Sequence, residues 1–228
     1  MPLYPCRFRS GRREVDTAIV NTYVEGARSW DLELVLDGLT FRGRSFTDFH
    51  IDATACTPEA LDGLVVRRVF DESEGQDVLV LQDFELEITF PLTLRDREGY
   101  PLPTRLHVCL TADGEARFWI PVGAETFRSL IREFSFPAVL ADLNFQMRGR
   151  FSLQNCFGCT YGDYSPFGAP SFGSMLCFRR CREVYRKTRT VDGFFALMAQ
   201  AIGVQETHCC PEFEPRGRKN AGSRGRIL

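Results

Sequence analysis

Residues 83–94 read DFELEITFPLTL, and this stretch is the strongest indication of the fold class. Its apolar residues, Phe84 and Leu86 among them, alternate with polar residues such as Glu85 and Glu87. A period of two over this length predicts a strand with one buried face and one solvated face, which is typical of an antiparallel sheet. Pro91 predicts an edge or a bulge near the end of this strand, because proline has no N–H to donate to a neighbour.

Further alternating runs predict strands on both sides of this stretch. Gly38 separates two of them, and Asp113-Gly114 separates two others, so both pairs are predicted as hairpins. The chain contains 20 Phe, an aromatic content that predicts a sizeable buried core. The predicted strands cover residues 32–36, 39–42, 64–70, 106–110, 116–120 and 144–153.

Two segments show a helical period instead. In residues 124–134, apolar side chains recur at i, i+3, i+4 and i+7, which predicts an amphipathic helix. Residues 191–202 repeat this spacing, and Asp192 is placed to cap their start. Thr57-Pro58 predicts a brief helix start. The sequence therefore predicts an α+β fold: an antiparallel sheet or sandwich with two amphipathic helices, closed by a C-terminal cysteine site.

The cysteines cluster late in the chain. Residues 155–182 read NCFGCTYGDYSPFGAPSFGSMLCFRRCR and hold four of the nine cysteines. The first residues show no apolar run of a secretory signal, and no stretch is long enough to span a membrane, so we expect a cytoplasmic protein. In that compartment clustered cysteines are more often metal ligands than disulfides, and we predict a structural zinc site.

The cysteine spacing leaves the ligand set open. Cys156-x2-Cys159 supplies two thiolates from one tight turn, and Gly158 relieves the backbone there. Cys177 and Cys181 follow at a spacing that resembles a zinc ribbon. Other candidates for the remaining positions lie near the C-terminus, namely Cys209, Cys210 and, less favoured, His208.

A resemblance narrows this choice. The segments CFGC, YGDYSPFG, CFR and CPEF resemble an uncharacterised bacterial protein family of unknown function with a C-x2-C, SDYSPYG, CFR and Cys-Pro-Glu-Phe pattern. Residue by residue, the resemblance implies Cys156, Cys159, Cys177 and Cys210 as the metal ligands. The family pattern needs no cysteine at Cys181, which we keep as the substitute if Cys210 is not a ligand. The sequence departs from the pattern at Gly162, where the family has Ser, and in lacking the closing tyrosine.

Four thiolates would form a closed zinc site without a position for a reacting water. We therefore predict a binding protein rather than an enzyme, in which the loop between the ligand pairs presents a surface to a protein partner. That loop carries the residues Tyr161, Asp163, Tyr164, Ser165 and Phe167. The structural alternative is that the rings of this loop pack inward. The main functional alternative is a thiol enzyme that uses Cys181 or Cys209 near His208.

Charge supports neither a membrane nor a strong nucleic-acid partner. The formal net charge is −2, although both termini are basic. A weak nucleic-acid binder that uses these termini is the last alternative. We expect three regions: a β-rich region at 1–143, a cysteine region at 144–215 packed on the same domain, and a mobile basic tail at 216–228. The partner and the oligomeric state are left open.

Overall fold

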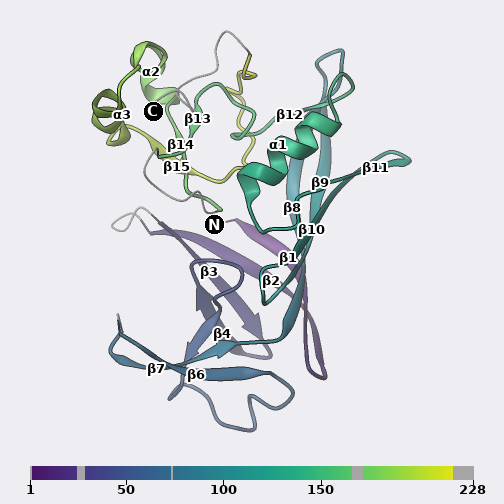
Figure 1. Cartoon of the computed structure of the whole chain (residues 1–228), viewed down its shortest axis with the longest axis vertical. Helices are drawn as coiled ribbons and strands as arrows, with labels where there is room; N and C mark the ends of the chain where they lie inside the picture. Colours follow the sequence, from purple (N-terminus) through teal and green to yellow (C-terminus); the bar gives the residue numbers. More distant parts are fainter. Residues whose placement is uncertain (1, 25–28, 73, 166–171, 218–228) are drawn as a thin grey trace. The chain divides into compact units, whose positions relative to one another are not determined.

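The strand predicted at residues 83–94 is β8 (Phe84–Arg95) in the computed structural model (Figure 1). Buried and partly exposed residues alternate along it, except that Pro91 is exposed. Pro91 lies between the residues of β8 that pair with β1 and those that pair with β12. β8 also has β9 as a neighbour, so Pro91 lies in an interior strand and not at the predicted edge. The structure describes residues 2–24, 29–72, 74–165 and 172–217, so the expected tail at 216–228 lies almost entirely outside the described residues.

Antiparallel strands dominate the fold, as predicted. The larger sheet has the strand order β11-β10-β9-β8-β1-β2-β3-β4-β5-β7-β6, and β12 pairs with β8. Its strands other than β8 are β1 (Leu3–Ser10), β2 (Arg13–Val24), β3 (Ser29–Leu36), β4 (Leu39–Gly43), β5 (His50–Asp52), β6 (Val66–Asp71), β7 (Gln76–Leu81), β9 (Pro101–Thr111), β10 (Ala116–Val122), β11 (Glu125–Arg128) and β12 (Ser152–Leu153).

The remaining elements are short and lie late in the chain. A three-stranded sheet has the order β13 (Gly162–Asp163), β14 (Met175–Cys177) and β15 (Ile202–Val204). The helices are α1 (Phe136–Gln146), the 3-10 turn η1 (Arg179–Cys181), α2 (Arg182–Lys187) and α3 (Val191–Met198). The described part of the chain is thus broadly α+β, with mostly antiparallel strands and three short α-helices. No helix among the described residues is both long and apolar enough to cross a membrane.

The residues divide into two compact units that are not consecutive in sequence. Unit 1 comprises Met1–Phe90, Leu106–Trp119 and Ile131–Phe134. Unit 2 comprises Pro91–Arg105, Ile120–Leu130 and Ser135–Leu228. Strands β8, β9 and β10 each contribute residues to both units.

Phenylalanines are buried in both units, as predicted from composition, and those of unit 1 include an extended set of ring contacts. Phe90 contacts Tyr4 at 4.6 Å and Phe46 at 5.9 Å between ring centroids. Phe134 joins them through Phe46 at 5.2 Å and Phe118 at 5.7 Å. Tilted and edge-on ring pairs such as these stabilise a core beyond the burial of apolar area alone.

The hairpin predicted at Gly38 is a two-residue turn between β3 and β4. Asp37 has φ 48° and Gly38 has φ 89°, so both central residues adopt the left-handed conformation of a type I′ turn. Asp-Gly is a favoured pair for this turn, because glycine reaches positive φ without steric cost. The Asp113-Gly114 turn between β9 and β10 is also confirmed, with Gly114 at φ 88°.

The helix predicted at residues 124–134 is wrong. Residues Glu125–Arg128 form β11, in which Phe127 is buried, whereas Leu130 is 79% exposed. The helix begins later, as α1, behind the N-cap Ser135 and Pro137. The strand predicted at 144–153 is correspondingly reduced to the two residues of β12, because α1 runs through Gln146. Tertiary burial of Phe127 therefore overrides the apparent helical period.

Two other helix predictions need smaller corrections. Residues 57–63 form turns rather than a helix. The helix predicted at 191–202 ends at Met198, and β15 begins at Ile202. Its cap is Thr190, whose side-chain oxygen accepts from the Gly193 N–H, and Asp192 lies instead in the first turn. A threonine at this position satisfies one of the orphan N–H groups at the start of a helix.

Candidate metal centre

A tight turn at residues 155–159 holds Cys156 and Cys159, the first two predicted ligands. The Oδ1 atom of Asn155 accepts a hydrogen bond from the Gly158 N–H at 3.0 Å, and the Cys159 N–H donates to the carbonyl of Cys156 at 3.3 Å. A Cβ atom at Gly158 would overlap the carbonyl oxygen of Leu153. Glycine is therefore required at this position, because the Leu153 backbone lies too close to leave room for a side chain.

The small sheet brings Cys177 to this turn. Cys177 is the last residue of β14, and its register partner in β13 is Gly162. The Phe178 N–H also donates to the carbonyl of Tyr161 at 2.9 Å. A Cβ atom at Gly162 would overlap the carbonyl oxygen of Cys156, so β13 lies directly against the turn that holds the first two cysteines. Glycine is therefore required at position 162 by the close approach of the Cys156 backbone.

The C-terminal segment runs beside the same turn and delivers Cys210. The Cys156 N–H donates to the carbonyl of His208 at 2.7 Å, and the Thr160 N–H donates to the carbonyl of Glu214 at 2.8 Å. The Arg216 N–H donates to the carbonyl of Gly158 at 2.9 Å, and the Arg216 guanidinium donates to the carbonyl of Cys159. These bonds fix the segment on both sides of Cys210.

All four predicted ligands, Cys156, Cys159, Cys177 and Cys210, line one small cavity in unit 2. Its volume is about 10 Å³, which is the room needed by roughly one water-sized sphere. Burial raises the pKa of Cys156, and the three neighbouring cysteines raise it further because their thiolates would repel a fourth. Burial also raises the pKa of Cys177, whereas the nearby Arg179 opposes this effect. A cation at this point would reverse the mutual repulsion of the thiolates.

The donor set and the surroundings of this cavity fit a thiophilic ion. The Nδ2 atom of Asn155 is buried and has no hydrogen-bond partner among the described residues, and Asn155 lines the cavity. A tetrahedral site with zinc–sulfur bonds of about 2.3 Å needs sulfur atoms about 3.8 Å apart. In the described residues no three cysteine sulfurs lie within 4.8 Å of one another. Binding therefore requires some cysteine side chains to rotate inward about their Cα–Cβ bonds.

The remaining candidates lie outside this cavity. Cys181 packs in an apolar cluster with Phe178, Tyr185 and Phe194, and burial raises its pKa. Cys209 is exposed, and partial burial of its thiol raises its pKa too. Burial and then Arg179 lower the pKa of His208. A nucleophilic cysteine needs a lowered pKa, so these surroundings do not favour the thiol-enzyme alternative.

The loop between the ligand pairs packs inward over its described part, which excludes Phe167. Tyr161 and Asp163 are each only 1% exposed, and the Tyr185 hydroxyl donates to Asp163 at 2.7 Å. The Tyr164 hydroxyl donates to the buried Glu206 at 2.9 Å. This agrees with the structural alternative and does not support an exposed aromatic surface at Tyr161 and Asp163.

The carboxylates near the C-terminus are ion-paired. Glu214 accepts from Arg186 at 2.7 Å and from the Tyr161 hydroxyl at 2.8 Å, and Glu212 pairs with Arg182. These contacts join α2 to the segment that carries Cys210. They also give both carboxylates a structural partner, so neither is available as an unassigned acid or base.

Sequence reasoning missed three residues that surround the cavity or its turn: Asn155, Arg179 and Arg216. An asparagine just before a tight turn is a readable signal, because its side chain often accepts a hydrogen bond from a backbone N–H further along. The two arginines gave no local signal. Arg179 reaches the cavity from η1. Arg216 comes from the C-terminal segment and donates to the Cys159 carbonyl of the adjoining turn.

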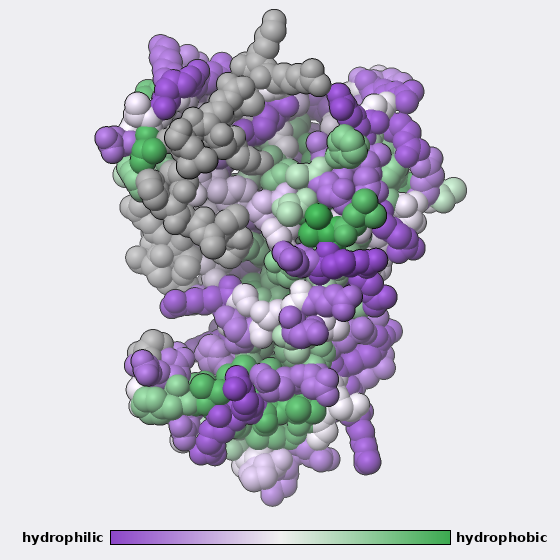
Figure 2. Space-filling model, in the orientation of Figure 1, coloured by the Kyte–Doolittle hydropathy of each residue, from purple (hydrophilic) through white to green (hydrophobic). Residues whose placement is uncertain are grey.

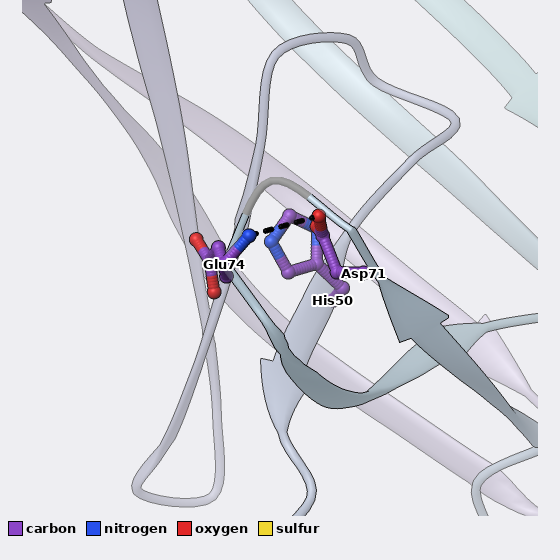
Figure 3. Close-up of side chains that lie close together, drawn as sticks. All are labelled: His50, Asp71 and Glu74. Carbon is purple, nitrogen blue, oxygen red and sulfur yellow. Dashed lines mark hydrogen bonds between the residues drawn. The ribbon is translucent and has the colours of Figure 1, made fainter.

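A different group of possible ligand atoms lies in unit 1. His50, Asp71 and Glu74 each place one such atom within 4.8 Å of the others (Figure 3). The Glu74 N–H donates to Asp71 at 3.3 Å, and the Gln76 amide donates to the Glu74 carboxylate at 3.0 Å. These hydrogen bonds belong to the turn between β6 and β7, and turn geometry accounts for the closeness of the two carboxylates.

The comparisons with known proteins identify a family but no activity. A family model described as a family of unknown function (DUF6304) matches residues 5–162. The expectation of an uncharacterised family is thereby confirmed, although the match includes Cys156 and Cys159 and ends before Cys177 and Cys210. The C-terminal motif is therefore not covered. No curated protein and no solved structure matches the chain.

Proposed function

The chain belongs to the DUF6304 family of unknown function, and we propose that it is a non-enzymatic cytoplasmic binding protein stabilised by one structural zinc ion. Its ligands are Cys156, Cys159, Cys177 and Cys210. The observation that carries this proposal is the convergence of these four residues, from three separate segments, on one cavity of about 10 Å³. Four thiolates complete a tetrahedron and leave no open position, so the ion stabilises the fold and activates no water.

The short elements around the cavity support a structural role for the metal. β13 has two residues, and β14 and β15 have three each. Strands this short contribute little stability by themselves. Zinc binding contributes about 10–16 kcal/mol in zinc-finger peptides at neutral pH, which is ample to order a small sheet. The ion would thus hold the C-terminal segment against the turn at residues 155–159.

A binding role requires an exposed surface, and the surface proposed here lies on α1. Phe145 is 70% exposed, and Leu130 is 79% exposed. The Leu130 N–H donates to the Asp142 carboxylate of α1 at 2.7 Å, so Leu130 lies beside this helix. On the face shown in Figure 2, hydrophilic residues prevail and apolar residues emerge in small patches. Asp142 and Phe145 are three residues apart, a spacing that makes them neighbours on the helix surface, so we assign Leu130 and Phe145 to one contact surface.

Metal analysis of purified protein tests the zinc proposal. We expect one equivalent of zinc in the wild type and a large loss in Cys177→Ser and Cys210→Ser. Cys181→Ser and Cys209→Ser are the matched controls and should retain the metal, because neither residue lines the cavity. Equal zinc contents in Cys210→Ser and Cys209→Ser would refute the assigned ligand set.

Alkylation separates this proposal from the thiol enzyme. In the zinc-loaded protein, the four ligand thiolates should resist a maleimide reagent until a chelator is added. Cys209 is exposed and should be labelled at an ordinary rate. The thiol-enzyme alternative would be favoured if Cys181 or Cys209 were labelled rapidly at neutral pH and the labelling abolished a catalytic activity of the protein.

A further inference from the structure

Asn155 combines two properties that together indicate a role at the metal. It is fully buried, with no exposed area, and it lines the cavity with the four cysteines. Its Oδ1 atom accepts from the Gly158 N–H at 3.0 Å. That bond fixes the orientation of the amide, because an N–H donor must face the oxygen.

With the amide fixed, the Nδ2 atom is left with its donors unused. It is buried and has no hydrogen-bond partner among the described residues. A buried donor without a partner costs about 1–3 kcal/mol. Such donors are rare in native proteins, and a bound ion or a functional role commonly explains them. Here the missing acceptors are available in the same cavity, because a metal-bound thiolate sulfur accepts hydrogen bonds.

The charge around the cavity gives an independent argument. Zinc with four thiolates carries two net negative charges, and burying that charge requires positive groups nearby. Arg179 also lines the cavity, where its positive charge interacts favourably with Cys177 and Cys210. Asn155 and Arg179 therefore provide the two kinds of partner, a neutral N–H donor and a cation, that a buried anionic centre needs.

We propose that Asn155 is a positioning residue of the metal centre, with one end shaping the Cys156–Cys159 turn and the other end donating to the ligand sulfurs. Arg179 supplements it by balancing the charge of the thiolates. This inference rests on the proposed zinc site and goes beyond it, because it names the groups that set how tightly the ion is held. Partners in this outer layer typically change metal affinity by about 10- to 100-fold.

The test uses Asn155→Asp, which keeps an oxygen to accept from Gly158 and replaces the amide donor with an anion. Asn144→Asp is the matched control, because Asn144 likewise accepts a backbone N–H, that of Leu153 at 3.2 Å, but does not line the cavity. Zinc affinity is measured by competition with a chromophoric chelator. The sulfur-to-metal charge-transfer band of the cobalt-substituted protein reports the sulfur environment directly.

We expect Asn155→Asp to bind zinc about 10- to 100-fold more weakly and to shift the cobalt band, with Asn144→Asp close to wild type. Equal affinities and equal bands in both variants would overturn the inference while leaving the zinc site intact. A wild type that binds no metal would instead overturn the proposed function, and this inference with it.

A second pair of variants covers failure of Asn155→Asp to fold. Arg179 is partly exposed, with 32% of its side chain accessible, so its substitution is tolerable for the fold. Arg179→Gln should weaken zinc binding and shift the cobalt band, whereas Arg179→Lys should restore most of the affinity. Identical affinities in both would show that Arg179 does not balance the centre.

Discussion

Gly162 is the position at which a single added methyl group should most disturb the proposed metal centre. It pairs with Cys177 across β13 and β14, and it faces the Cys156 carbonyl. In Gly162→Ala, the new Cβ would lie 3.0 Å from the carbonyl carbon of Cys156, closer still to its oxygen, and 3.3 Å from the Met175 sulfur. The backbone of Cys156 cannot yield as a flexible side chain would, so β13 and the turn must separate.

The expected cost is at the upper end of that for overpacking a native interior, about 3 kcal/mol. For a chain of this length, that loss corresponds to a fall in Tm of about 6–12 °C. Thermal unfolding by circular dichroism measures this change, and a zinc-release assay with a colorimetric chelator measures the metal in parallel. Gly217→Ala is the control, because no atom lies within 4 Å of a Cβ built there. A Gly162→Ala protein with wild-type Tm and zinc content would refute the steric argument.

Three other perturbations probe the proposed metal site, a helix cap and a partly buried carboxylate. Chelation should make the C-terminal part of unit 2 sensitive to protease while the strands of unit 1 stay protected; uniform cleavage would contradict this. Thr190→Ala should lower the free energy of unfolding by about 1 kcal/mol, because it removes the acceptor for the Gly193 N–H; an unchanged denaturant midpoint would contradict it. Burial acts to raise the pKa of Asp142, but hydrogen bonds from Leu130, Ser129 and Gln146 outweigh this and hold the pKa below its usual range. The resulting stabilisation is therefore present above the unfolded-state pKa of about 3.9 and is lost as the pH falls through the lower folded-state value. Asp142→Asn should lose about 1–2 kcal/mol at pH 7, with a difference from wild type that shrinks in acid; a difference independent of pH would contradict this.

Much of the sheet could be predicted from the sequence, because burial on one face leaves a local trace. In β8 the alternation from Phe84 onward is a direct consequence of one side facing the core. Asp37-Gly38 likewise carries its own turn geometry. Both signals are local, and both are confirmed.

The helix at residues 124–134 was mispredicted because the spacing of its apolar residues is compatible with a different structure. Phe127 is buried from a strand, and Leu130 is exposed beyond it. The better signal was Ser135 followed by Pro137, a cap and a first-turn proline that mark the true start of α1. For locating the start of α1, Ser135 and Pro137 are more informative than the spacing of the apolar residues.

The candidate site was only partly readable. The Cys-x2-Cys spacing identifies Cys156 and Cys159 as candidate ligands. Cys210 and Arg179 reach the cavity only through tertiary contacts, which leave no local pattern in the sequence. Spacing alone could not choose Cys210 over Cys181. In the structure Cys210 lines the cavity with Cys156, Cys159 and Cys177, whereas Cys181 does not, and this difference supports the proposed ligand set.

The interleaving of the two units has a consequence for biosynthesis. Unit 2 takes Pro91–Arg105 from the middle of the chain, but Cys210 emerges from the ribosome roughly a hundred residues later. At about 5–20 residues per second, those early segments wait on the order of 5–20 s for the last thiol. The proposed metal site can therefore be completed only after Cys210 is synthesised, long after the central segments of unit 2.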